Sequence, residues 1–173
     1  TGALSVSVTC NGDSQMAAAA QISIAPVVAT EVISGSTRMK AGTAQKMVLN
    51  MISTGVMVRV GKVYQNYMVH VQPTNEKLVV RAERMISEIT GADRDRAAKA
   101  LKESKMAVPE AIVMVSSGCS LDRAKEVLDQ ADGRVREAIE LAKYVTSVSK
   151  GADMKDCDSV HDEIGKLIEE GVI

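Results

Sequence analysis

The chain has 173 residues, of which 46% are hydrophobic and 25% charged, and its formal net charge at pH 7 is -1. These proportions are those of a globular protein, and they exclude the strong positive field that attracts nucleic acid. No stretch reaches the roughly 20 apolar residues of a membrane span, so no membrane partner is expected. With no Phe, no Trp and three Tyr, the core must be built from Val, Ile, Leu, Ala and ten Met.

The cysteines and histidines indicate neither a disulfide framework nor a metal site. Cys10, Cys119 and Cys157 are odd in number and widely separated, which is typical of a reducing, cytoplasmic compartment. We interpret Cys10 as a buried, structural thiol. His70 and His161 each lack a second ligand at helical spacing, so no metal is expected.

The first part of the chain predicts two strands with a short helix between them. The strands are expected over residues 4–10 and 22–28, and the Ala-rich helix over 14–20. This order is the βαβ unit of a parallel sheet. Ligands of such sheets bind beyond the carboxyl ends of the strands, which here are residues 10–14 and 29–37.

The run of residues 31–46 reads Glu-Val-Ile-Ser-Gly-Ser-Thr-Arg-Met-Lys-Ala-Gly-Thr-Ala-Gln-Lys. Its chemically notable residues are Glu31, Ser34, Ser36, Thr37, Arg38 and Lys40. They precede a helical pattern, where backbone N–H groups and hydroxyls suit an anion such as phosphate. The same hydroxyl residues also serve as ordinary helix caps, and Glu31 alone is equally interpretable as a solvated charge.

An amphipathic helix is predicted to follow this run. Its small and apolar residues recur at three- and four-residue intervals, which places one stripe against a core. The stripe consists of Ala44, Met47, Val48, Met51, Ile52 and Gly55. The Met-rich face of the helix over residues 40–54 is also a candidate subunit interface.

Residues 74–142 predict an all-helical region. Helices are expected from Thr74 or Asn75 to Thr90, over 94–104, over 109–118, over 120–128, and from Gly133 onward. Asn75 or Thr74, Asp93 and Ser120 are their caps, and Gly91 ends the first. Residues 143–173 form a third segment, with a polar linker over 150–159 and a weak terminal helix after it.

The signature run resembles that of the N-acetylmuramic acid 6-phosphate etherases and the related glucokinase regulatory proteins. Their pattern is Gly-Pro-Glu, followed closely by Gly-Ser-Thr-Arg-Met/Leu-Lys-Ala-Gly-Thr-Ala. The resemblance continues through residues 46–55, 61–64 and 74–78, covers roughly residues 4–142, and is closer to the etherases than to the regulators.

Three positions depart from the family pattern. Ala29-Thr30 stands where Gly-Pro is usual, Gln65 where a Gly is usual, and His70 where an Asp is usual. None of these changes removes a hydroxyl or basic residue of the signature.

The resemblance implies an α/β fold whose residues 1–73 are the second half of a doubly wound, parallel-sheet sugar isomerase (SIS) domain. The first half, with the family's main acid/base glutamates and a Gly/Ser phosphate loop, would precede Thr1. This piece alone is therefore expected to be inactive. Residues 108–142 also resemble a three-helix module of the ubiquitin-associated (UBA) type, which implies either a peptide-binding surface or a helical part of the etherase body.

The implied activity is that of a carbon–oxygen lyase in cell-wall amino-sugar recycling. It cleaves the D-lactyl ether of N-acetylmuramic acid 6-phosphate to give N-acetylglucosamine 6-phosphate and D-lactate, without a cofactor, in a homodimer. In phosphosugar isomerases with a similar Glu-x-x-x-x-Ser-Thr pattern the residue matching Glu31 is the base, so Glu31 is the catalytic candidate. The resemblance assigns phosphate and sugar contacts to Ser34, Ser36, Thr37, Arg38 and Lys40.

Two other functions remain open from the sequence. One is a non-catalytic, sugar-phosphate-binding regulatory protein that shares the signature. The other is a helical protein-interaction module, based on residues 108–142.

Overall fold

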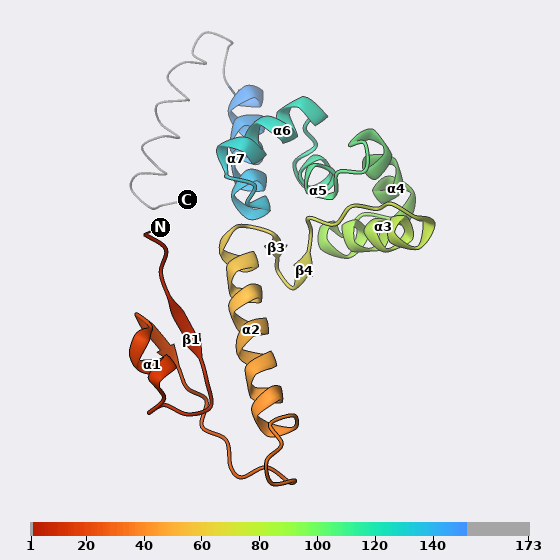
Figure 1. The fold of residues 1–173 in the computed structure, drawn as a ribbon. Helices are drawn as coiled ribbons and strands as arrows, with labels where there is room; N and C mark the ends of the chain where they lie inside the picture. Colours follow the sequence, from red (N-terminus) through yellow and green to blue (C-terminus); the bar gives the residue numbers. More distant parts are fainter. Residues whose placement is uncertain (1, 152–173) are drawn as a thin grey trace. The chain divides into compact units, whose positions relative to one another are not determined.

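A computed structural model describes the backbone of residues 2–151 and the side chains up to residue 146 (Figure 1). The chain divides into two compact units between Val56 and Met57, which we call the N-terminal unit and the helical unit. The domain boundaries predicted at residues 73 and 142 stay predictions. Within residues 2–151, no helix is long and apolar enough to cross a membrane.

The N-terminal unit contains the predicted βαβ arrangement. Its elements are β1 (Val6–Val8), α1 (Gln15–Ala19), β2 (Ile22–Ile24) and most of α2 (Lys40–Arg59). The strands β1 and β2 pair in parallel, with Val6 opposite Ile22, so the mixed α/β class is confirmed. Helix α1 begins where predicted because the Ser14 hydroxyl accepts a hydrogen bond from the Ala17 N–H, at 3.1 Å.

The predicted burial of the α2 stripe is wrong for the structure described here. Among the residues of α2, Val48 is buried, whereas Met47 and Met51 are 57% and 61% exposed and Ile52 is 43% exposed. The two three-residue strands offer too little apolar surface to cover a helix of 20 residues. The periodic pattern identified the helix correctly, but a pattern does not say what covers its apolar face.

The helical unit contains the predicted helices. They are α3 (Glu76–Thr90), α4 (Arg94–Glu103), α5 (Val108–Ser117), α6 (Leu121–Gln130) and α7 (Val135–Gly151). Side chains of Asn75, Asp93 and Ser120 cap three of them, as expected. Helix α7 continues to Gly151, beyond the predicted start of the linker. The rest of that linker and the terminal helix, with Cys157 and His161, lie outside the described residues.

The core of the helical unit is aliphatic. Its largest fully buried hydrophobic side chains are Val69, Ile86, Leu101, Val108, Ile112, Val113 and Val127. Among the described methionines, Met85 is the one buried in this core. The expectation of an Ile, Leu, Val and Ala core is thus confirmed, but methionine contributes much less to it than the composition suggested.

A hairpin that the sequence analysis did not predict precedes α3. Strands β3 (Val63–Tyr64) and β4 (Tyr67–Met68) pair in antiparallel fashion across a two-residue loop. Gln65 in this loop has φ of 55°, the left-handed region that favours glycine. The family's usual Gly at this position is therefore explained by backbone conformation. The available signal was a polar Gln-Asn pair flanked by β-forming tyrosines.

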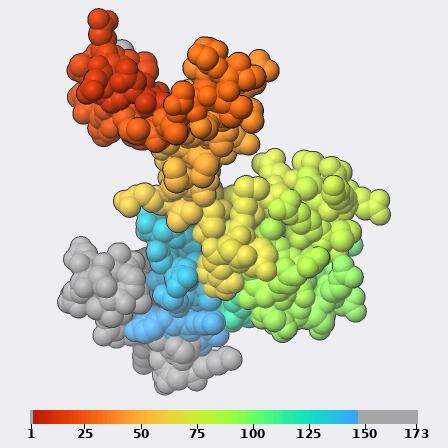
Figure 2. Space-filling view, turned by 90° about the horizontal axis from the view of Figure 1, so that it is seen from below, coloured from red at the N-terminus to blue at the C-terminus, as the bar shows by residue number. Residues whose placement is uncertain are grey.

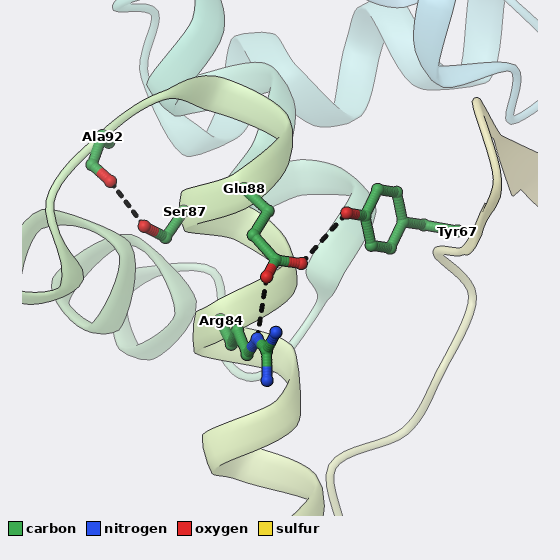
Figure 3. Close-up of polar contacts among 5 residues, drawn as sticks. All are labelled: Tyr67, Arg84, Ser87, Glu88 and Ala92. Carbon is green, nitrogen blue, oxygen red and sulfur yellow. Dashed lines mark hydrogen bonds and ion pairs between the residues drawn. The ribbon is translucent and has the colours of Figure 1, made fainter.

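A small polar cluster ties the hairpin to α3 (Figure 3). The Tyr67 hydroxyl donates to Glu88 Oε2 at 3.0 Å, and Arg84 Nε donates to Glu88 Oε1 at 2.7 Å. These two hydrogen bonds, that of Arg84 first, lower the pKa of Glu88. Nearby, the Ser87 hydroxyl donates to the carbonyl of Ala92 at 2.6 Å, which fixes the turn after α3.

The segment after the hairpin lies against the start of α7; Figure 2 shows the yellow residues of the hairpin region beside the blue ones of α7. His70 Nε2 lies 3.5 Å from the carbonyl of Gly133, and Lys62 Nζ lies 3.3 Å from His70 Nδ1. Partial burial and then the charge of Lys62 lower the pKa of His70, against smaller opposite effects of Gly133 and Glu110. The neutral imidazole is thus the form that fits this junction.

We therefore expect the helical unit to lose stability as the pH falls below about 6.5, the usual pKa of histidine. The folded-state pKa is lowered, so the unfolded chain binds the proton more readily and protonation favours unfolding. Thermal unfolding between pH 8 and pH 5.5 should show a steeper fall in Tm for the wild type than for His70→Asn, which cannot titrate. Parallel pH profiles for the two proteins would contradict the prediction.

Candidate functional site

The signature run begins with a tight turn. The Ser36 N–H donates to the carbonyl of Ile33 at 3.1 Å, and Gly35, the third residue of the turn, has φ of 82°. A turn with a positive φ at this position is of type II and favours glycine. It leads the chain directly from the exposed Ser34 to Ser36 and Thr37.

The carboxylate of Glu31 lies at the start of α2. It accepts hydrogen bonds from the Lys40 N–H, at 3.1 Å to Oε1 and 3.2 Å to Oε2, and from the Ala41 N–H, at 3.0 Å to Oε1. Lys40 Nζ also donates to the carbonyl of Thr30. The bonds from Ala41 and then Lys40 lower the pKa of Glu31. The anion at this helix start is therefore the protein's own carboxylate.

The hydroxyl residues next to it are also bound to the backbone. The Arg38 N–H donates to Ser36 Oγ at 3.3 Å, and the Gly42 N–H donates to the carbonyl of Thr37 at 2.9 Å. Ser36 Oγ accepts in this contact, so its own proton remains available for a ligand. A Cβ at Gly42 would lie 3.3 Å from that carbonyl oxygen of Thr37, so the close approach favours glycine.

A cavity of about 390 Å³ lies beyond the carboxyl end of β1, beside the first turns of α2. It is lined by Val8, Thr9, Cys10, Asn11, Thr37, Ala41, Gly42 and Gln45. Its size is within the range of small-molecule pockets, roughly 300–1,000 Å³. Of the predicted site residues, Thr37 lines it. Glu31, Ser34, Ser36, Arg38 and Lys40 do not.

Two polar residues of this cavity were missed by the sequence analysis. The side chain of Gln45 makes no hydrogen bond within the described part of the chain, so its carboxamide can meet a ligand. Asn11 accepts a hydrogen bond from the Asp13 N–H at 3.1 Å through its side-chain oxygen, which leaves its amide donors. Both residues could have been predicted from their positions. Asn11 lies just beyond the carboxyl end of β1, where ligands of parallel sheets bind, and Gln45 lies one helical turn after Ala41, on the same face of α2. Cys10 is half-buried and lines the cavity.

A larger cavity, of about 560 Å³, lies in the helical unit. Its charged lining residues are Lys105, Glu110 and Asp129, with His70 beside them. The mixture of signs does not favour one class of ligand. Within the described residues, no group of three or more His, Cys, Asp or Glu side chains is arranged to hold a metal ion.

A parallel strand–helix–strand unit with a cavity beyond its first strand is the arrangement in which α/β proteins commonly bind ligands. No protein-family model matches the chain. The chain is similar in sequence to N-acetylmuramic acid 6-phosphate etherases. The etherase of Clostridium botulinum is 59% identical over 116 residues, which are 67% of this chain and 38% of the relative. That of Symbiobacterium thermophilum is 62% identical over 112 residues, 65% of this chain and 37% of the relative.

A third relative, N-acetylmuramic acid 6-phosphate etherase 1 of Enterococcus faecalis, is 57% identical over 116 residues, 67% of this chain and 39% of the relative. The matched part of this chain belongs to the N-acetylmuramic acid 6-phosphate etherase family, which confirms the resemblance noted in the sequence. The chain spans about 38% of the length of the curated relatives it matches.

Proposed function

We propose that this chain is part of an N-acetylmuramic acid 6-phosphate etherase, a lyase of cell-wall amino-sugar recycling that works in the cytoplasm. The reaction cleaves the D-lactyl ether and gives N-acetylglucosamine 6-phosphate and D-lactate. The observation that carries the proposal is the identity of 57–62% to relatives with this name. The cavity beyond β1 supports it, because a pocket of about 390 Å³ at a strand end, with polar side chains in its lining, suits a phosphorylated amino sugar.

The proposed chemistry is an elimination followed by an addition. A base removes the proton next to the carbonyl of the open-chain sugar, lactate leaves, and water adds to the unsaturated intermediate. Carboxyl groups suit both proton transfers when their pKa is raised by burial. The described residues around the cavity include no carboxyl group. The main acid and base are therefore expected outside the described lining of this cavity.

The signature supplies the proposed contacts to phosphate and sugar. Thr37 lines the cavity, and the neighbouring hydroxyls of Ser36 and Ser34 add donors. Arg38 in the same loop and Lys40 at the first position of α2 are exposed cations, and such groups strengthen hydrogen bonds to phosphate.

At the level of architecture, we propose that the βαβ unit is part of a doubly wound SIS sheet and that α5–α7 form a UBA-like module within the enzyme body. The parallel pairing of β1 and β2 supports the first, and the three short-looped helices support the second. We also propose a homodimer, with the exposed apolar face of α2 as a candidate contact.

The function is tested with the full-length protein and N-acetylmuramic acid 6-phosphate. Release of D-lactate, measured with a lactate dehydrogenase assay, is the expected result. Binding of the sugar phosphate without release of lactate would instead identify a regulatory protein. Deleting residues 108–142 tests the interaction-module alternative, which requires that partner binding be lost.

A further inference from the structure

We propose that Glu31 is a positioning residue and not the catalytic base: its carboxylate fixes the first turn of α2 as one wall of the sugar-phosphate cavity. The identity of the ligand is taken from the proposed function. The role of Glu31 is inferred independently, from the geometry of the N-terminal unit.

The first observation is that both carboxylate oxygens of Glu31 accept hydrogen bonds from the backbone. Oε1 accepts from the N–H groups of Lys40 and Ala41, at 3.1 and 3.0 Å, and Oε2 lies 3.2 Å from the Lys40 N–H. Lys40 Nζ returns to the carbonyl of Thr30. The two ends of the loop that carries the signature hydroxyls are thus held together by contacts in both directions.

The second observation connects this clamp to the cavity. Ala41, whose N–H is bound by Glu31, lines the cavity, and its carbonyl lies 3.9 Å from Sγ of Cys10, another residue of the lining. Glu31 itself is absent from the lining. A general base needs an oxygen or nitrogen within hydrogen-bond reach, about 2.6–3.2 Å, of the atom whose proton it removes. Glu31 therefore acts on the cavity through Ala41.

The third observation concerns proton affinity. Hydrogen bonds from two backbone N–H groups stabilise the ionised carboxylate, and they lower the pKa of Glu31 below its ordinary value. A general base works best when its pKa is close to the working pH. The environment of Glu31 lowers its pKa, which moves it further from the working pH. The same environment suits a charged carboxylate that caps a helix.

The test compares Glu31→Gln and Glu31→Ala in the full-length protein. The glutamine keeps one oxygen that can accept both N–H groups, so kcat should stay within about tenfold of wild type and the pH dependence of kcat should be unchanged. The alanine should raise KM and speed hydrogen exchange of the Lys40 and Ala41 amides by about tenfold or more. Glu76→Gln, which changes an exposed acid in the first turn of α3, is the matched control and should leave these values unchanged.

A loss of about 10²–10⁴-fold in kcat for Glu31→Gln at constant KM, with loss of one limb of the pH profile, would identify a base and overturn the inference. Unchanged amide exchange in Glu31→Ala would overturn it as well. If Glu31→Ala does not fold, the kinetics of Glu31→Gln decide. Amide exchange needs no substrate, so a wild-type protein that releases no lactate refutes the proposed function, while the exchange rates still decide the role of Glu31.

Discussion

Replacing Ser36 by Ala and Thr37 by Val together is expected to weaken binding of the sugar phosphate to the full-length protein by about 100-fold. A hydrogen bond to a charged group contributes roughly 1.5–3 kcal/mol, and each 1.4 kcal/mol is a factor of ten in Kd. Thr37 lines the cavity, and Ser36 keeps its hydroxyl proton for a ligand. Isothermal titration calorimetry with N-acetylmuramic acid 6-phosphate measures the change.

The two single variants separate direct contact from loop geometry. Thr37→Val preserves the shape of the side chain and removes its hydroxyl. Ser36→Ala also removes the acceptor of the Arg38 N–H, so part of its effect comes from a looser loop. Ser53→Ala is the control, because this exposed hydroxyl of α2 donates to the Asn50 carbonyl and does not line the cavity. An unchanged Kd in the double variant would refute the assignment of the phosphate contacts.

The sequence predicted the elements of this protein better than their packing. Asn75, Asp93 and Ser120 cap the helices that they were expected to cap, because a cap is a local interaction between neighbouring residues. The stripe on α2 was found by its period, but what covers a stripe depends on residues far away in the sequence. The hairpin was missed because its two-residue strands are too short for a periodic signal.

The same distinction applies to the candidate site. The sequence predicted a ligand site beyond the carboxyl ends of the two strands; the structure has a cavity lined by Cys10, Asn11 and Thr37 beyond β1, and the ligand site itself stays a prediction. The bonds of Glu31 to the Lys40 and Ala41 N–H groups join residues nine and ten positions apart, and no spacing rule for helices or strands predicts such a pair. The charge of Glu31 was therefore visible in the sequence, but its partner was not.

Replacing Gly61 by Ala is expected to lower the free energy of unfolding of the helical unit by about 3 kcal/mol. Gly61 ends α2 in a Schellman motif, in which the Lys62 N–H donates to the Met57 carbonyl at 2.9 Å and the Gly61 N–H to that of Val58 at 3.2 Å. Its φ of 73° costs another residue about 1–2 kcal/mol. A Cβ there would also lie 2.7 Å from Arg134 Cγ and 3.3 Å from Arg134 Cα, and relieving such overlap costs about 1–3 kcal/mol.

Gly91→Ala separates the two contributions. Gly91 has almost the same φ, 71°, but a Cβ at this position meets nothing within 4 Å, so its cost should be about 1 kcal/mol. Urea unfolding followed by far-UV circular dichroism should therefore show a clearly lower midpoint for Gly61→Ala than for Gly91→Ala. Equal midpoints would mean that the start of α7 moves away from Gly61 at no cost.

A double-mutant cycle with Arg134→Ala tests the contact itself. The Arg134→Ala substitution removes Cγ, the atom that would lie nearest to a Cβ at position 61. It also removes the ion pairs of Arg134 with Asp132 and Glu137, which are exposed and contribute little to stability. Gly61→Ala should then cost about 1–2 kcal/mol less in the Arg134→Ala background than in the wild type, because contacting residues are not additive. Strict additivity would show that the Arg134 side chain contributes nothing to the cost of Gly61→Ala. The backbone atoms of Arg134 remain close in both backgrounds, so part of the penalty should persist.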